Sequence, residues 1–192
     1  MTTDDGGGRR ANRRATYLVT VPLPDAAALV APWRRTNRLG AHVTLLRPFT
    51  TVPLDPVARQ RFARRLRCEP RFRATLGALG WFDGRVVYAR PDQGPRWVEL
   101  ARVASLALER GVLDETVTPH VTVAKGLDRQ ELEEAAARTS ARLPWTVTAR
   151  SAILYEQDPA TGRWHPLVRA AFAGSPPTAR HHREGGAAST RR

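Results

Sequence analysis

Residues 116–126 read TVTPHVTVAKG, and the core of this stretch, His120-Val121-Thr122-Val123, occurs a second time as His42-Val43-Thr44-Leu45. Both copies are rich in the β-branched residues that favour strands. Side chains alternate between the two faces of a strand, so the histidine and the threonine of each copy share one face. Two such strands, if they face a shared cleft, would place two imidazoles and two hydroxyls together.

A single His-x-Thr segment is weak evidence, because it also suits the polar edge of a half-buried sheet. The second copy strengthens the case, as does the basic residue that follows each threonine by three positions, Arg47 and Lys125. By strand alternation these two residues point away from the histidines unless a bulge or a strand end turns them back. A zinc site would be short of ligands, because no Asp, Glu or Cys stands near either histidine at ligand spacing.

The composition suits a single basic globular body. The chain has 192 residues, 42% of them hydrophobic, with a formal net charge of +13. A basic body favours anionic partners such as nucleic acid or nucleotides. The alternative is a general compositional preference for Arg, which would place these charges on ordinary solvated surfaces.

No apolar run approaches the ~18 residues that a membrane span requires, and no apolar stretch follows the basic N-terminal residues. We therefore expect a cytoplasmic protein with no membrane contact, and a monomer. The lone Cys68 is expected to be a buried small side chain. Residues 1–15 are expected to be a disordered leader, 16–173 the domain, and 174–192 a disordered basic tail.

The expected elements alternate irregularly between strands and helices. Strands are predicted at 17–21, 42–46 (ended by Pro48), 72–81, 86–89, 145–154 and 164–172, with the second His-x-Thr strand inside the stretch 116–126, and helices at 26–31, from about 55, from about 97, and 129–141. Asp83-Gly84 predicts a hairpin turn, and Asp25, Asp55 and Asp128 predict helix N-caps. This order predicts an α+β fold, and its near-repetition suggests two lobes related by a pseudo-two-fold axis.

The paired His-Val-Thr segments, their separation and the element order resemble the two-histidine phosphoesterase superfamily, in particular bacterial 2'-5' RNA ligase-like proteins. The resemblance covers about residues 16–172. It implies a bilobal fold with two antiparallel sheets facing a central cleft and helices outside. It also implies metal-independent chemistry, without a cofactor, on 2',3'-cyclic or 2'-5' phosphodiesters, with His42, Thr44, His120 and Thr122 as the catalytic residues.

The residue chemistry suits that activity. Hydrolysis of a cyclic phosphodiester needs a base for the water and an acid for the departing ribose oxygen, and imidazoles titrate near neutral pH. In related enzymes the first histidine is usually the acid and the second the base, which would assign His42 and His120 respectively. Threonine hydroxyls would donate to the non-bridging phosphate oxygens.

Substrate binding is expected to involve a further set of residues. Lys125, which the resemblance favours, and Arg47 would contact the phosphate. Tyr17, Trp81 and Tyr155 could stack a base or lie in the core, and Arg38, with Arg34 and Arg35, could contact an RNA backbone. The partners would be RNA ends or nucleotides with a cyclic phosphate. A non-catalytic RNA- or nucleotide-binding module and a plain structural domain remain as alternatives.

Overall fold

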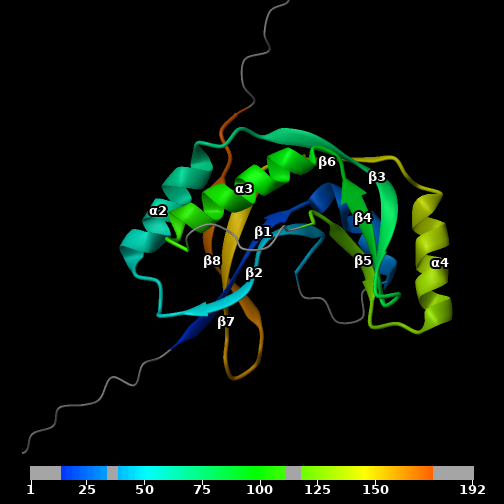
Figure 1. Cartoon of the computed structure of the whole chain (residues 1–192), viewed down its shortest axis with the longest axis horizontal. Helices are drawn as coiled ribbons and strands as arrows, with labels where there is room; N and C mark the ends of the chain where they lie inside the picture. Colours follow the sequence, from blue (N-terminus) through cyan, green and yellow to red (C-terminus); the bar gives the residue numbers. More distant parts are fainter. Residues whose placement is uncertain (1–13, 34–38, 111–117, 175–192) are drawn as a thin grey trace, which may run out of the picture.

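The computed structural model of the chain describes residues 14–33, 39–110 and 118–174, and Figure 1 shows their arrangement. Eight strands and four α-helices make up an α+β fold in this part of the chain. The strands are β1 (Ala15–Pro22), β2 (His42–Thr51), β3 (Phe72–Phe82), β4 (Val86–Pro91), β5 (Val121–Lys125), β6 (Trp145–Ala149), β7 (Ser151–Gln157) and β8 (Trp164–Ala171). The helices are α1 (Ala27–Val30), between the 3-10 turns Pro24–Ala26 and Ala31–Trp33, α2 (Pro56–Arg67), α3 (Gly94–Ala107) and α4 (Arg129–Ser140).

The strands form one antiparallel sheet in the order β6-β3-β4-β5-β2-β1-β7-β8. The two sheets expected from the sequence are therefore two halves of a single curled sheet (Figure 1). The halves join at β5 and β2, the two strands that carry the His-x-Thr segments, where Val43 pairs with Val121. The duplicated segments thus lie side by side at the centre of the sheet.

Each half of the sheet has its own helices. α2 and α3 contact each other, and they pack against β8, β7 and β2 (Figure 1). α4 packs against β3, β4 and β5, and α1 also contacts β5. Buried side chains of these helices, such as Phe62, Trp97 and Leu132, join Val43 and Val121 in one hydrophobic core. The helices therefore cover the face of the sheet that the two valines share.

Two of the three predicted helix caps are confirmed, whereas Asp25 lies inside the 3-10 turn Pro24–Ala26 and does not cap α1. The Asp55 carboxylate accepts a hydrogen bond from the Ala58 N–H at 2.7 Å, and Asp128 forms a reciprocal capping box with Glu131. Each cap satisfies backbone donors that the first helical turn leaves without partners, which stabilises a helix by about 1 kcal/mol. The Asp83-Gly84 hairpin is also confirmed, with φ of 48° and 65° at its two central residues. A two-residue turn with positive φ at both positions matches the twist of the strands it connects.

Two strand boundaries differ from the prediction. Residues 145–154 form two strands, because the chain leaves β6 beside β3 and enters β7 beside β1, on opposite halves of the sheet. β2 continues past Pro48 to Thr51. Pro48 lies between the pairs Val19–Leu46 and Tyr17–Phe49, where the register shifts, so the missing N–H interrupts no regular ladder.

Cys68 is exposed rather than buried, because it caps the C-terminus of α2, where its thiol donates to the Arg64 carbonyl at 3.4 Å. No helix in the described residues is both long and apolar enough to span a membrane. β1 begins at Ala15, the last residue of the expected leader. The rest of that leader up to residue 13, and the tail from residue 175, lie outside the described residues.

Candidate active site

The pairing of β2 with β5 brings the four motif side chains together. Val43 and Val121 are paired and fully buried, so they point into the core. In an antiparallel register with this pair, His42 lies opposite Thr122 and Thr44 lies opposite His120, all on the other face of the sheet. We call this the motif face. The two histidines are therefore diagonal neighbours on this face, and diagonal neighbours in such a ladder lie about 7–8 Å apart.

Both histidines make the same local hydrogen bond. Nδ1 of His42 lies 2.7 Å from the Gly40 carbonyl oxygen, and Nδ1 of His120 lies 2.8 Å from the Thr118 carbonyl oxygen. A carbonyl can only accept, so Nδ1 must carry the hydrogen in each ring. In the neutral form Nε2 therefore carries the lone pair, and both imidazoles are held in the tautomer that can take or give a proton at Nε2.

His120 sits against two aromatic rings. The centroids of Phe82 and Tyr88 lie 4.9 Å and 5.4 Å from its own, and both rings are roughly perpendicular to the imidazole. Burial lowers the pKa of His120, and the positive charge of Arg47 lowers it further, while the hydrogen bond to Thr118 acts in the opposite direction. The net effect favours a neutral imidazole at neutral pH, as a general base requires.

A β-bulge in each motif strand changes where the basic residues point. Thr20 pairs with Thr44 but Val19 pairs with Leu46, so β2 contains one extra residue after its threonine. Tyr88 pairs with Thr122 but Val87 pairs with Ala124, and β5 contains an extra residue at the same place. A bulge shifts the alternation by one position. Arg47 and Lys125 therefore return to the motif face, through the kind of bulge expected as the exception to regular alternation.

A family comparison gives the context for this arrangement. Residues 22–161 match the model of the 2'-5' RNA ligase superfamily. The chain belongs to this superfamily. No curated protein matches the chain.

Solved structures of similar fold include the following two. Escherichia coli LigT in its apo form has a TM-score of 0.58 and 19% sequence identity, over 83% of this chain and 98% of that one. A structure described as a phosphoesterase has a TM-score of 0.55 and 20% sequence identity, over 83% of this chain and 99% of that one. These likenesses show that the chain has the fold of those structures.

Tyr155 lies on the motif face of this superfamily member, two strands out from the histidines. Thr20 is opposite Thr44 on one side and Ile153 on the other, and Tyr155 follows Ile153 by two residues. The Tyr155 hydroxyl hydrogen-bonds Thr20, and burial raises the pKa of Tyr155. Its role in stacking a base stays a prediction. Thr20 was not predicted as a site residue, because only the strand pairing places it beside Thr44.

Two other predicted residues, Tyr17 and Trp81, do not join the site. Tyr17 is fully buried on the core face, where its hydroxyl donates to Glu156 and accepts from the Leu54 N–H. Trp81 lies opposite the buried Val87 on the same core-facing side, beneath the Arg129 guanidinium. Both are therefore wrong as base-stacking residues. Arg38, with Arg34 and Arg35, lies outside the described residues.

Phe82 and Tyr88 are two further residues of the site that sequence reasoning missed. Within the sequence they read as ordinary apolar residues of a hairpin, and only the pairing of β4 with β5 brings them to His120. Within the described residues, no three His, Cys, Asp or Glu side chains form a group that could hold a metal ion.

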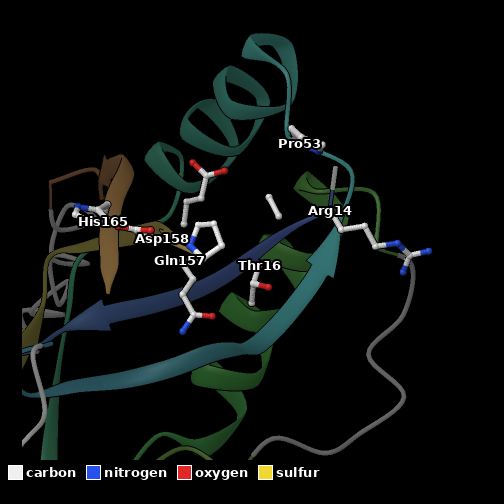
Figure 2. Close-up of a pocket in the computed structure, with 9 residues that line it drawn as sticks. Arg14, Thr16, Pro53, Gln157, Asp158 and His165 are labelled. Carbon is white, nitrogen blue, oxygen red and sulfur yellow. The ribbon is translucent and has the colours of Figure 1, made fainter. Parts of the chain in front are cut away.

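A separate pocket of about 830 Å³ lies at the far end of β1 (Figure 2). Its lining includes Arg14, Thr16, Gln157, Asp158 and His165. The Asp158 carboxylate is already engaged in its own turn, where it accepts hydrogen bonds from the Ala160 N–H and the Thr161 hydroxyl. This pocket contains none of the four motif residues.

Proposed function

We propose that this protein is a metal-independent phosphodiesterase that hydrolyses 2',3'-cyclic phosphate, at an RNA end or in a small nucleotide. If the 5'-hydroxyl of a second RNA end attacks phosphorus in place of water, and the bond from phosphorus to the ribose 3' oxygen breaks, the same residues would join the two ends reversibly through a 2'-5' bond. The observation that carries the proposal is the Val43–Val121 pairing, which places one histidine and one threonine from each motif strand on a single face. Membership of the 2'-5' RNA ligase superfamily supports the same chemistry.

In the proposed reaction His120 is the general base and His42 the general acid. Nε2 of neutral His120 takes a proton from water as the water oxygen attacks phosphorus. The bond between phosphorus and a ribose oxygen breaks on the opposite side, and that oxygen takes a proton from Nε2 of protonated His42. One proton enters the pair and one leaves, so the second turnover requires only proton exchange with solvent. In the reverse reaction the two histidines exchange roles.

Thr44 and Thr122 would hold the phosphate between the two histidines. Each threonine lies opposite the histidine of the other strand, so its hydroxyl can donate to a non-bridging oxygen. Lys125 and Arg47, returned to this face by the two bulges, would supply positive charge to the same phosphate. Donors positioned in advance stabilise developing charge without reorganising during the reaction.

Two further comparisons support a nucleotide phosphate as the ligand. Structures of E. coli LigT have been solved with phosphate and with 3'-AMP, at TM-scores of 0.54 to this chain and 20% identity. Both ligands carry a phosphate group, and 3'-AMP carries it on the ribose. We infer that the motif face of this chain takes the phosphate of a related ligand.

We further infer that the two halves of the sheet are related by a pseudo-two-fold axis between β2 and β5. Outward from this axis the order is β2-β1-β7-β8 on one side and β5-β4-β3-β6 on the other. Each motif strand has its bulge in the same place, each is preceded by a helix, and each is followed by another. This relationship would present the two histidines to the phosphate from opposite sides.

The proposal is tested by incubating the purified protein with 2',3'-cyclic nucleotides and with an RNA ending in a cyclic phosphate, in excess chelator. Turnover is expected, with a loss of at least ~10²-fold in His42→Ala and His120→Ala. His165→Ala, at an exposed position on β8, is the matched control and should retain full activity. No turnover by the parent protein, or full turnover by both motif variants, would rule out the enzyme.

The same variants separate the enzyme from a non-catalytic binding module. A binding module would give no turnover, would bind RNA equally well after both histidine substitutions, and would lose affinity steeply with salt. A plain structural domain would neither turn over nor bind.

A further inference from the structure

The aromatic neighbours of His120 form a compact pair that we call the aromatic wall, made of Phe82 and Tyr88. Their rings stack on each other with centroids 4.2 Å apart and an interplanar angle of 22°. Both meet the His120 ring edge to face, at interplanar angles of 78° and 63°. Tyr88 is only 5% exposed, so its ring is packed against other side chains and has no open face on which a nucleobase could stack.

The wall depends on a glycine. Gly80 lies directly opposite Tyr88 in the β3–β4 ladder. A Cβ atom at position 80 would lie 2.3 Å from Cζ and 2.4 Å from the hydroxyl oxygen of Tyr88, which real Cβ atoms do not tolerate. Because Tyr88 is confined by Phe82 and His120, any side chain at this position would push its ring out of place. Gly80 thus leaves room for the wall.

The wall also distinguishes the two halves of the site. The counterpart of Tyr88, on the strand beside the other motif strand, is Thr20, which lies opposite Thr44 as Tyr88 lies opposite Thr122. The counterpart of Gly80, one strand further out, is Ile153. The two His-x-Thr segments are nearly identical in sequence, but the residues opposite them on the neighbouring strands differ.

We propose that the aromatic wall, seated by Gly80, is a positioning element that fixes the His120 ring and shields one side of it from water, so that His120 serves as the base. The base role rests on the proposed function, whereas the positioning is a property of the protein without substrate. Phe82 and Tyr88 touch the imidazole and not the reacting atoms, so they act on the reaction through His120.

Shielding from water favours the uncharged form of the ring, which agrees with the lowered pKa of His120. By strand register, the charged or titratable residues that share the motif face with His120 are Arg47 and His42 on β2, Lys125 on β5, and Tyr88 and Arg90 on β4. Of these, Arg47 is the cation whose charge lowers the pKa of His120, in the same direction as burial. An aromatic face can instead attract imidazolium, which would raise the pKa. The two effects have opposite signs, so measurement separates them.

The experiment is an NMR titration of the His120 imidazole in the full chain without substrate. Removing one ring of the wall by Tyr88→Leu or Phe82→Leu should raise the midpoint pH of the His120 titration by about half a pH unit, because solvent then reaches the imidazole. Tyr88→Phe keeps the ring and should leave the midpoint in place. Gly80→Ala keeps every wall residue but displaces Tyr88, so it should reproduce the upward shift. This variant carries the test if Tyr88→Leu does not fold.

Trp81→Leu is the matched control. Trp81 is the neighbour of Phe82 on the same strand, but it lies on the opposite face, and its loss should move neither the His120 midpoint nor activity. In kinetics, Tyr88→Leu should lower kcat several-fold with little change in KM. An unchanged or lowered midpoint in the wall variants, or an equal shift in Trp81→Leu, would overturn the proposal. Because the titration needs no turnover, that result is distinct from failure of the proposed activity.

Discussion

Arg47 on β2 lies near enough to His120 on β5 for its positive charge to lower the pKa of that imidazole. The two residues come from different copies of the duplicated segment, so the first copy influences the chemistry of the second. The interaction arises because a bulge after Thr44 turns Arg47 to the motif face. In the proposed reaction this basic residue has two effects, since it attracts the phosphate and keeps the base neutral.

Removing this charge should change the pH dependence of the reaction. A base with a lowered pKa stays neutral, and active, to lower pH, and activity falls as pH drops through that pKa. Arg47→Ala should therefore move the acid side of the kcat/KM profile to higher pH, and Arg47→Met should do the same. Arg47→Lys should retain the parent profile. Arg163→Ala removes an exposed charge in the β7–β8 turn and is the control. If the pH profile of Arg47→Ala were the same as that of Arg163→Ala, the proposed effect of Arg47 on His120 would be refuted.

The threonine hydroxyls should matter more for the rate than for substrate binding. Thr44→Val and Thr122→Val preserve shape and remove one donor each. The loss of one preorganised donor to a developing oxyanion costs about 10²–10³ in kcat. We expect a fall in that range for each variant, with KM changed much less, measured on a cyclic nucleotide. Thr50→Val, an exposed threonine further along β2, should be neutral. Equal rates in all three variants would exclude a role for the hydroxyls.

The features of this site that follow from alternation within one strand could be predicted from sequence. The features that depend on how the strands pair could not. Alternation within one strand predicts that His42 and Thr44 share a face, and likewise His120 and Thr122, and both predictions hold. The same rule fails for Arg47 and Lys125, because a bulge depends on the partner strand. The two consecutive buried residues before each basic residue, Leu45-Leu46 and Val123-Ala124, are the local signal that alternation breaks there.

The least reliable predictions were those that depend on which face of the sheet a side chain occupies. Tyr17 and Tyr155 read alike in sequence, but Tyr17 takes the core face and Tyr155 the motif face. The break between β6 and β7 was missed because the apolar pattern runs through it, while the two strands pair with β3 and β1 on different halves of the sheet. Local signals, such as the Asp83-Gly84 turn and the two aspartate caps, needed no knowledge of pairing.

The break between β6 and β7 also predicts a pH-dependent contribution to stability. The Asp25 carboxylate accepts hydrogen bonds from the Thr148 N–H at 2.8 Å and from Arg150 at 2.9 Å, joining the first 3-10 turn to the edge strand. Partial burial acts to raise the pKa of Asp25, but the hydrogen bonds from Arg150 and Thr148 outweigh it and lower that pKa. A lowered carboxyl pKa stabilises the fold above the unfolded-state pKa, and this stabilisation is lost as pH falls through the folded value.

Asp25→Asn should therefore reduce the free energy of unfolding by about 1–2 kcal/mol at pH 7, measured with urea, and the difference from the parent should shrink below about pH 4. Glu133→Gln, at an exposed ion pair on α4, should cost less than about 0.5 kcal/mol. A difference for Asp25→Asn that stays constant down to pH 3 would contradict the assignment.

The central claim is that two histidines from the paired strands act together on one phosphorus atom. The most direct measurement compares the hydrolysis rate of a 2',3'-cyclic nucleotide, under chelation, in His42→Ala, His120→Ala and the double variant. Residues that act as a unit give strongly non-additive losses. The account predicts that each single variant loses nearly all of the rate and that the double variant is scarcely slower than either. Two small losses that multiply in the double variant would contradict it.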